Sequence, residues 1–199
     1  MDTKTEPLMI DLPAEIPAGR FVLRAPRPGD GALLNAAVCA SIAALRPWMP
    51  WAQQAPTLAE SELECRRMAA RFARREDLPL FIVEPGPDGA ERIVGGTGLH
   101  RIDWSVPRFE IGYWRRSDDG RRGMVAEAVR YVNRLAFDQL GAQRVEIRMD
   151  SRNAASRRVA ERAGFTFEGL LRRDMLTVDG KPRDTLVYSR GRGVEEVGN

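Results

Sequence analysis

The chain alternates between hydrophobic and polar positions in several short segments, as strands with one buried face do. The clearest case is the sequence Phe-Glu-Ile-Gly-Tyr-Trp at residues 109–114, and residues 144–149 alternate in the same way. Shorter runs of this kind predict further strands over residues 21–25, 80–84, 93–102, 165–171 and 185–189. The pattern therefore predicts a sheet of about seven strands.

Hydrophobic residues recur at helical spacing in four other segments. The predicted helices cover residues 30–45, 57–75, 124–140 and 153–163. Thr57 and Glu60 have the spacing of a capping box, and Gly141 and Gly164 follow the last two helices as common stop residues. We therefore expect four helices flanking the sheet.

The order of these elements is one strand, two helices, three strands, a helix, a strand, a helix and two strands. Such mixed connections predict an α+β fold with a twisted, mostly antiparallel sheet and one helical crossover between parallel strands. We expect one domain over residues 19–190. Residues 1–18 contain three prolines and predict an irregular arm, and residues 191–199 predict a flexible tail.

Composition excludes some partners. The net charge of +3 over 199 residues is too small to argue for nucleic acid binding. No stretch reaches the length of a membrane span, and the N-terminus lacks a signal pattern, so we expect a cytoplasmic protein without a membrane partner. Cys39 and Cys65 lie in predicted helices without metal-ligand spacing, so we expect no metal.

A polar, glycine-containing segment lies between the strand at 109–114 and the helix that starts near Met124. It carries four arginines, at positions 115, 116, 121 and 122. A basic loop that opens a helix suits a phosphate, because the first helical N–H groups and the helix dipole favour an anion there. Solvated arginines in an ordinary connection explain the segment equally well. It matches neither a Walker A loop nor the dinucleotide fingerprint.

At this point a resemblance appears. Residues 109–129 resemble the acetyl-CoA signature of the GNAT N-acetyltransferases, in the branch of the ribosomal-protein N-terminal acetyltransferases, RimJ and RimL. That family's loop has Arg or Gln, two residues, Gly, one residue, then Gly or Ala. Gly123 aligns with the second Gly. Asp118 and Arg121 replace the leading Arg/Gln and the first Gly, and Gly120 lies one place early.

A second motif fits the same branch in full register. The branch has Asn, two residues, Ser, then Glu, Gly-Phe and Glu-Gly. These residues are Asn153, Ser156, Glu161, Gly164, Phe165, Glu168 and Gly169. The resemblance covers nearly the whole chain and implies the GNAT fold, in which the central strands splay apart to admit the pantetheine arm of CoA.

The resemblance also implies a reaction, direct transfer of acetyl from acetyl-CoA to a primary amine. The acceptor it favours is the α-amino group of a protein or peptide. A small amine, such as a polyamine, an antibiotic or an amino acid, is an alternative, and so is a non-catalytic CoA-binding module. We expect a monomer or a homodimer.

The residues that would bind the cofactor follow from the two motifs. They are Tyr113, Trp114, Arg115, Gly120, Arg121, Arg122, Gly123, Met124, Val125, Asn153 and Arg157. Asn153 also has a purely structural interpretation as a helix N-cap. Ser156 would be the general acid near the thioether, or simply a residue of the first helical turn.

The general base stays open among three residues. Glu110 is the first choice, because it lies on the central strand beside the expected thioester, although it also suits a solvated strand position. His100, the only histidine, is chemically able to act as a base. Asp174 lies near a glutamate of the ribosomal-protein enzymes.

Residues 46–51, Arg-Pro-Trp-Met-Pro-Trp, form an aromatic corner between the first two predicted helices. The branch carries a similar segment near its acceptor. The corner is either a plug on the core or an aromatic wall of the acceptor pocket, and both roles are compatible.

Overall fold

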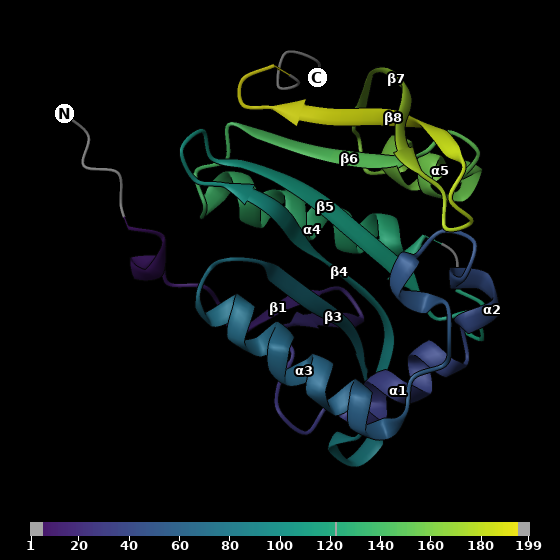
Figure 1. Ribbon diagram of the computed structural model, residues 1–199. Helices are drawn as coiled ribbons and strands as arrows, with labels where there is room; N and C mark the ends of the chain where they lie inside the picture. The colour runs from purple at the N-terminus through teal and green to yellow at the C-terminus, as the bar shows by residue number, and fades with distance from the viewer. Residues whose placement is uncertain (1–5, 122, 195–199) are drawn as a thin grey trace.

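The computed structural model describes residues 6–121 and 123–194. Its described part contains one mixed sheet of eight strands in the order β1-β2-β3-β4-β5-β6-β8-β7 (Figure 1). The strands are β1 Glu15–Ala18, β2 Phe21–Arg24, β3 Leu78–Pro85, β4 Glu91–Asp103, β5 Arg108–Arg115, β6 Arg144–Asp150, β7 Thr166–Leu176 and β8 Pro182–Gly191. Every neighbouring pair is antiparallel except β5 and β6. The expected α+β class, with a mostly antiparallel sheet and one parallel pair, is confirmed.

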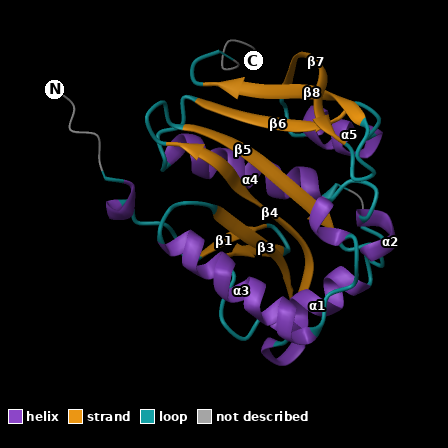
Figure 2. Cartoon of the chain, in the orientation of Figure 1, coloured by secondary structure: helices purple, strands orange, loops and turns teal. Residues whose placement is uncertain are grey.

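Helices cover both faces of this sheet (Figure 2). The described α-helices are α1 Gly31–Cys39, α2 Ile42–Leu45, α3 Leu58–Ala73, α4 Met124–Asp138 and α5 Ala154–Arg162, and short 3-10 turns occupy Pro7–Met9, Pro50–Ala52 and Pro87–Gly89. The buried side of α4 packs on β4 and β5, and α5 lies beside β6. Helices α1 and α3 cover the other face, on β3 and β4. No helix in the described ranges has the length and hydropathy of a membrane span.

The N-terminal segment is more ordered than its prolines suggested. The irregular arm expected through residue 18 is wrong for Glu15–Ala18, which forms β1 and pairs with β2 across a turn at Gly19. Gly19 has a φ of 66°, a conformation that glycine adopts without strain. This pairing gives the sheet eight strands instead of the expected seven.

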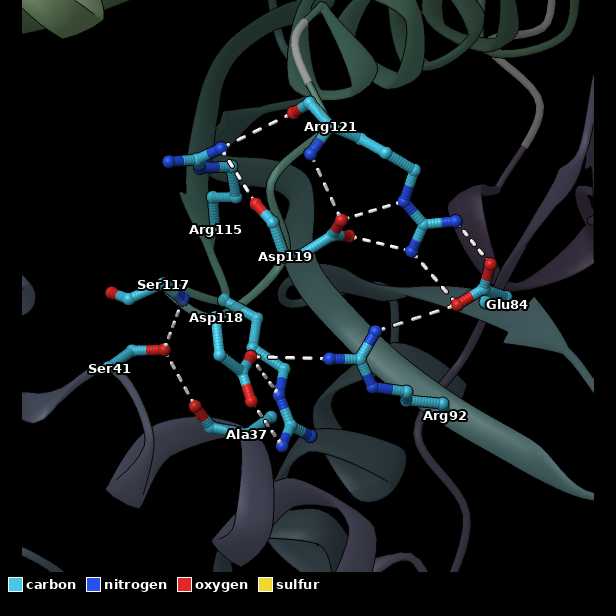
Figure 3. Close-up of polar contacts among 10 residues, drawn as sticks. Ala37, Ser41, Glu84, Arg92, Arg115, Ser117, Asp118, Asp119 and Arg121 are labelled. Carbon is cyan, nitrogen blue, oxygen red and sulfur yellow. Dashed lines mark hydrogen bonds and ion pairs between the residues drawn. The ribbon is translucent and has the colours of Figure 1, made fainter.

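The expected helix over 30–45 is also corrected, because it is two helices with a break at Ala40 and Ser41. The Ser41 hydroxyl donates to the carbonyl of Ala37 at 2.8 Å and accepts from the N–H of Ser117 at 2.9 Å (Figure 3). This side chain therefore ends α1 and ties it to the loop after β5. The described chain thus has five α-helices, not four.

The last strand pair and the chain end also differ from expectation. β7 continues to Leu176, five residues beyond the predicted strand, and β8 reaches Gly191. β7 lies at the sheet edge. The flexible tail was predicted over 191–199, of which 195–199 lie outside the described residues.

The two central strands separate midway, as expected. β5 and β6 pair only from Arg108–Glu110 to Arg144–Glu146. β5 then continues to Arg115, and β6 to Asp150, without pairing to each other. This divergence produces the opening in the middle of the sheet that positions the candidate site.

Candidate active site

One edge of β5 is free of strand partners beyond Glu110. Residues Ile111–Arg115 pair with β4 on one side, where Ile111 faces Leu99 and Arg115 faces Gly95. On the other side the described chain offers them no strand. Main-chain N–H and C=O groups along this edge can therefore bind an extended ligand as an added strand would.

Tyr113 spans the opening toward α5. Its hydroxyl lies 2.8 Å from the Ser156 hydroxyl and 3.0 Å from the Ser156 carbonyl oxygen. Burial raises the pKa of Tyr113 to about 12, so the phenol stays protonated at neutral pH. A phenol and a serine hydroxyl that share a hydrogen bond at the opening form a connected pair of proton donors.

Asn153 is the N-cap of α5. Its side-chain oxygen accepts from the Ser156 N–H at 3.0 Å, which confirms the structural interpretation of this residue. The cap fixes the first turn of α5 and so holds Ser156 against Tyr113. Arg157, one residue further, pairs with Glu161 at 2.8 Å on the exposed side of α5.

Helix α4 begins at a glycine N-cap that leaves its first turn uncapped by the described side chains. Gly123 is its N-cap with a φ of 88°, and no side chain caps the helix. Nothing lies within 4 Å of the position where a Cβ would stand at Gly120 or at Gly123. The side chains of Met124 and Val125 are buried in the core, which leaves their N–H groups for an anion. Arg122 lies outside the described residues.

The described loop arginines hold the loop itself (Figure 3). Arg121 donates to Asp119 through Nε and Nη2 at 2.7 Å and to Glu84 through Nη1 and Nη2. Hydrogen bonds from Arg121 hold the pKa of both carboxyl groups below their ordinary values. The guanidinium of Arg121 is therefore neutralised inside the protein, and it stacks on the Phe21 ring at 5.1 Å.

Two further arginines have similar internal partners. Arg115 donates to the carbonyl oxygens of Asp119 and Arg121, at 3.0 and 3.3 Å. Arg116 forms a two-point pair with Asp118, at 2.6 and 3.0 Å. Asp118 and Arg121, the two departures from the family loop, thus both belong to ion pairs that shape the loop.

The face of β5 opposite Tyr113 carries Glu110, the first-choice base. Burial raises the pKa of Glu110, although Arg101 opposes this with its Nε at 3.5 Å from Glu110 Oε2. That oxygen is buried and has no hydrogen-bond partner among the described residues. A carboxylate with a raised pKa is a stronger proton acceptor than an ordinary one. The site therefore suits Glu110 as a base.

The other two candidate bases, Asp174 and His100, have different hydrogen-bond partners. Asp174 accepts from Arg148 at 2.8 Å, and this hydrogen bond lowers its pKa, which makes it the weaker base. His100 faces Glu110 directly across β4 and β5. Its Nδ1 lies 2.6 Å from Oδ1 of Asp77.

Asp77 is the residue that sequence reasoning missed. It lies just before β3, whose first residue, Leu78, pairs with Leu99. Asp77 therefore meets His100 one step beyond the β3–β4 register. Only that register, and no local motif, would have found it.

The aromatic corner, residues 46–51, lies beside the face of β5 that carries Glu110 and Trp114. Trp114 folds over Gly96, where a Cβ would lie 2.3 Å from the indole nitrogen, and its ring meets Trp51 edge-on at 6.2 Å. A cavity of about 270 Å³ separates Pro47 and Trp48 from Arg152 and the hairpin tip at 177–179. Trp48 and Trp51 remain partly exposed. The corner can therefore act as an aromatic wall as well as a cover.

The described residues contain no group of His, Cys, Asp and Glu placed to hold a metal.

The chain is similar to several known acetyltransferases. The acetyltransferase (GNAT) domain family matches residues 20–166. A Bacillus subtilis (strain 168) protein named as the ribosomal N-acetyltransferase YdaF is 35% identical over 116 residues, 58% of this chain and 63% of that protein. The chain thus spans less than two thirds of the length of the curated relatives it matches.

Two solved structures show the same fold. The microcin C7 self-immunity acetyltransferase MccE, in complex with acetyl-CoA and AMP, is 22% identical with a TM-score of 0.82, covering 90% of this chain and 97% of that one. Mycobacterium smegmatis RimJ, in complex with CoA-disulfide, is 27% identical with a TM-score of 0.78, covering 96% and 91%. Since the family match covers most of its length, the chain belongs to the GNAT acetyltransferase family.

Proposed function

We propose that this chain transfers an acetyl group from acetyl-CoA to a primary amine, and that the acceptor is the α-amino group of a protein or peptide. The observation that carries this proposal is the free edge of β5, which runs from Glu110 to the loop before α4. One end of that edge offers a base and the other an anion site. An extended cofactor with a phosphate end and a reactive end suits such a groove.

The residues present fit acetyl-CoA. The bare backbone at Gly120 and Gly123 leaves room for phosphate oxygens at the uncapped N-terminus of α4. Main-chain groups of Tyr113, Trp114 and Arg115 would hold the pantetheine arm. When bound, acetyl-CoA supplies an activated acetyl thioester. Because the Arg121 guanidinium is already paired, we assign the phosphates to backbone N–H groups, with Arg115 bracing the loop.

Two side chains would move protons. Glu110 would take a proton from the attacking amine, which suits its raised pKa. Ser156 would give a proton to the leaving thiolate, with Tyr113 holding its hydroxyl in place. Asn153 acts indirectly by fixing the turn that carries Ser156.

The acceptor follows from the chemistry of amines and from the relatives. Deprotonating an α-amino group at pH 7 costs about 1 kcal/mol, whereas a lysine amine costs about 4–5 kcal/mol. A single carboxylate is sufficient for the former. The name of the relative YdaF describes a ribosomal N-acetyltransferase, which supports a protein α-amine as the acceptor here.

A small-molecule amine is the second candidate. The cavity beside Trp48 supports it, because about 270 Å³ suits a compact ligand better than a protein chain end. The non-catalytic alternative is disfavoured by the buried carboxylate of Glu110, which costs stability without an evident structural benefit.

The test is release of free thiol from acetyl-CoA over a panel of acceptors. The panel contains peptides that differ in their first residue, the same peptides with blocked N-termini, polyamines and amino acids. We expect turnover with free N-termini and none with blocked ones. Turnover restricted to small amines would replace the acceptor, and no turnover with any amine would contradict the proposed reaction.

A further inference from the structure

We propose that His100 and Asp77 form a proton relay that carries the amine's proton from Glu110 to solvent. This inference rests on the proposed acetyl transfer and adds two positioning residues to it. Neither residue needs to touch the acceptor, because both would act through Glu110.

The contact with Asp77 determines the tautomer of His100. Its Nδ1 lies 2.6 Å from Oδ1 of Asp77, and the side chain of Asp77 is 21% exposed. Because a carboxylate only accepts hydrogen bonds, Nδ1 must carry the proton. The lone pair of neutral His100 is therefore on Nε2. Asp77 fixes the ring so that its basic nitrogen faces away from β3.

Nε2 of His100 lies on the β5 side of the ring. A Cβ placed on Gly112 would lie 2.8 Å from Cδ2 and 3.0 Å from Nε2 of His100. The ring thus lies over the backbone of β5, in space that only a glycine leaves free. Gly112 and Glu110 are on the same face of β5, two residues apart, and Glu110 is the cross-strand partner of His100. The basic nitrogen therefore lies over β5 at Gly112, two residues along the strand from Glu110.

A proton that Glu110 has taken from the amine needs a route to solvent. The Glu110 side chain is 18% exposed, and its Oε2 is buried without a hydrogen-bond partner among the described residues. A proton received there must leave before the next turnover. The His100 side chain is 35% exposed, so it offers a path from the buried carboxyl group to water.

Charges from every neighbouring element surround this pair. Arg71 of α3 lies 3.9 Å from Asp77, and Arg101 of β4 lies 3.5 Å from Glu110. Glu146 and Arg148 of β6 also act on Glu110. Asp77 is the partner that holds the His100 ring in place.

In the proposed relay, every group that releases the proton has a named acceptor. The amine N–H bond breaks as the nitrogen attacks, and Glu110 takes that proton. Glu110 then passes the proton to Nε2 of His100, while Nδ1–H stays on its hydrogen bond to Asp77. The imidazolium releases the Nε2 proton to water, which restores both groups for the next cycle.

The experiment compares His100→Ala and Asp77→Asn with the wild-type chain, using the acceptor that the thiol-release screen identifies. We expect kcat to fall by about 10- to 100-fold in His100→Ala, with the KM for acetyl-CoA unchanged. Added imidazole should restore part of the rate, and the solvent deuterium isotope effect on kcat should rise, because proton exit becomes slower. Asp103→Asn, a matched change at the last residue of β4, should retain the wild-type kcat.

Each result decides the proposal. A wild-type kcat in His100→Ala overturns it. A reduced kcat that imidazole does not restore, with an unchanged isotope effect, also overturns it and leaves His100 a structural role. If His100→Ala does not fold, Asp77→Asn decides: a lower kcat with a larger isotope effect supports the relay, and an unchanged kcat overturns it. Absence of wild-type turnover with every amine would instead remove the proposed function, and the relay with it.

Discussion

Tyr113 and Ser156 are joined hydroxyl to hydroxyl at 2.8 Å, at the opening where β5 and β6 separate. Tyr113 comes from the central strand and Ser156 from the first turn of α5, so the contact links the two elements that border the opening. The Asn153 side chain caps this turn by accepting a hydrogen bond from the Ser156 N–H. The proposed acid therefore has two independent supports, and each can be removed separately.

Ser156→Ala should lower kcat by about 10²-fold or more while the KM for acetyl-CoA changes little, because this hydroxyl would act only on the leaving thiolate. Tyr113→Phe should lower kcat by a smaller factor, since the serine remains but loses its partner. Steady-state kinetics measure both. The control is Tyr131→Phe on α4, whose side chain lines a cavity beside β1 and should not affect kcat. Equal kcat in Ser156→Ala and wild type would contradict the assignment.

Gly123→Asp should weaken acetyl-CoA binding strongly. The substitution adds a negative side chain where phosphate oxygens are expected and strains a residue with φ of 88°. The matched control is Gly141→Asp, which has φ of 66°, equally open surroundings and a place after the other end of α4. In the wild type, ligand at 100-fold above its Kd should stabilise the fold by about 2.7 kcal/mol, visible as a rise in melting temperature. A full rise in Gly123→Asp would count against this loop.

Local periodicity was sufficient to predict much of this arrangement. The alternation over 109–114 separates Glu110 from Tyr113 onto opposite faces of one strand, and the structure has them there. The motif around Asn153 and Ser156 likewise predicts a capped helix start, and the cap is present. Such signals lie within a few residues of each other, so the sequence displays them directly.

Other features depend on contacts between distant segments and have no local signal. Arg121 meets Glu84 across 37 residues, and the sequence alone could not distinguish this pair from a solvated arginine. The break at Ser41 depends on Ser117, 76 residues away, within an Ala-rich stretch that favours a continuous helix. Asp77 requires the register of β3 against β4. Tertiary pairing decides each of these cases.

Glu84→Gln should destabilise the fold at neutral pH, by about 1 kcal/mol for a partly exposed network. Hydrogen bonds from Arg121 lower the pKa of Glu84, so its stabilising contribution is present above the unfolded-state pKa, near 4.5. The contribution is lost as the pH falls through the lower, folded-state value. Thermal melts of both proteins from pH 7 down to pH 3 should therefore converge at the acid end.

The control for this prediction is Glu76→Gln. Glu76 pairs with Arg74 at 2.6 Å, but both side chains are more than half exposed, so the change should have little effect on the melting temperature. If Glu84→Gln costs no more than Glu76→Gln at pH 7, the loop network contributes nothing beyond an ordinary surface pair.

Glu110→Gln should separate stability from activity. Burial raises the pKa of Glu110, so its ionised form is disfavoured in the folded state and lowers stability at neutral pH. Replacing it with the neutral glutamine should therefore raise the melting temperature at pH 7. This gain should shrink as the pH falls and the wild-type carboxyl group becomes protonated.

The same substitution should lower kcat by about 10²- to 10⁴-fold, because it removes the proposed proton acceptor while keeping the size and polarity of the side chain. The acidic limb of the pH–rate profile should disappear with it, and the loss should be larger for lysine-like amines than for α-amines, which deprotonate more readily. Melting curves and kinetics on one preparation test both halves. A more stable variant that keeps its rate and its acidic limb would show that Glu110 is a buried strand residue without a role in proton transfer, and His100 would then be the first base to examine.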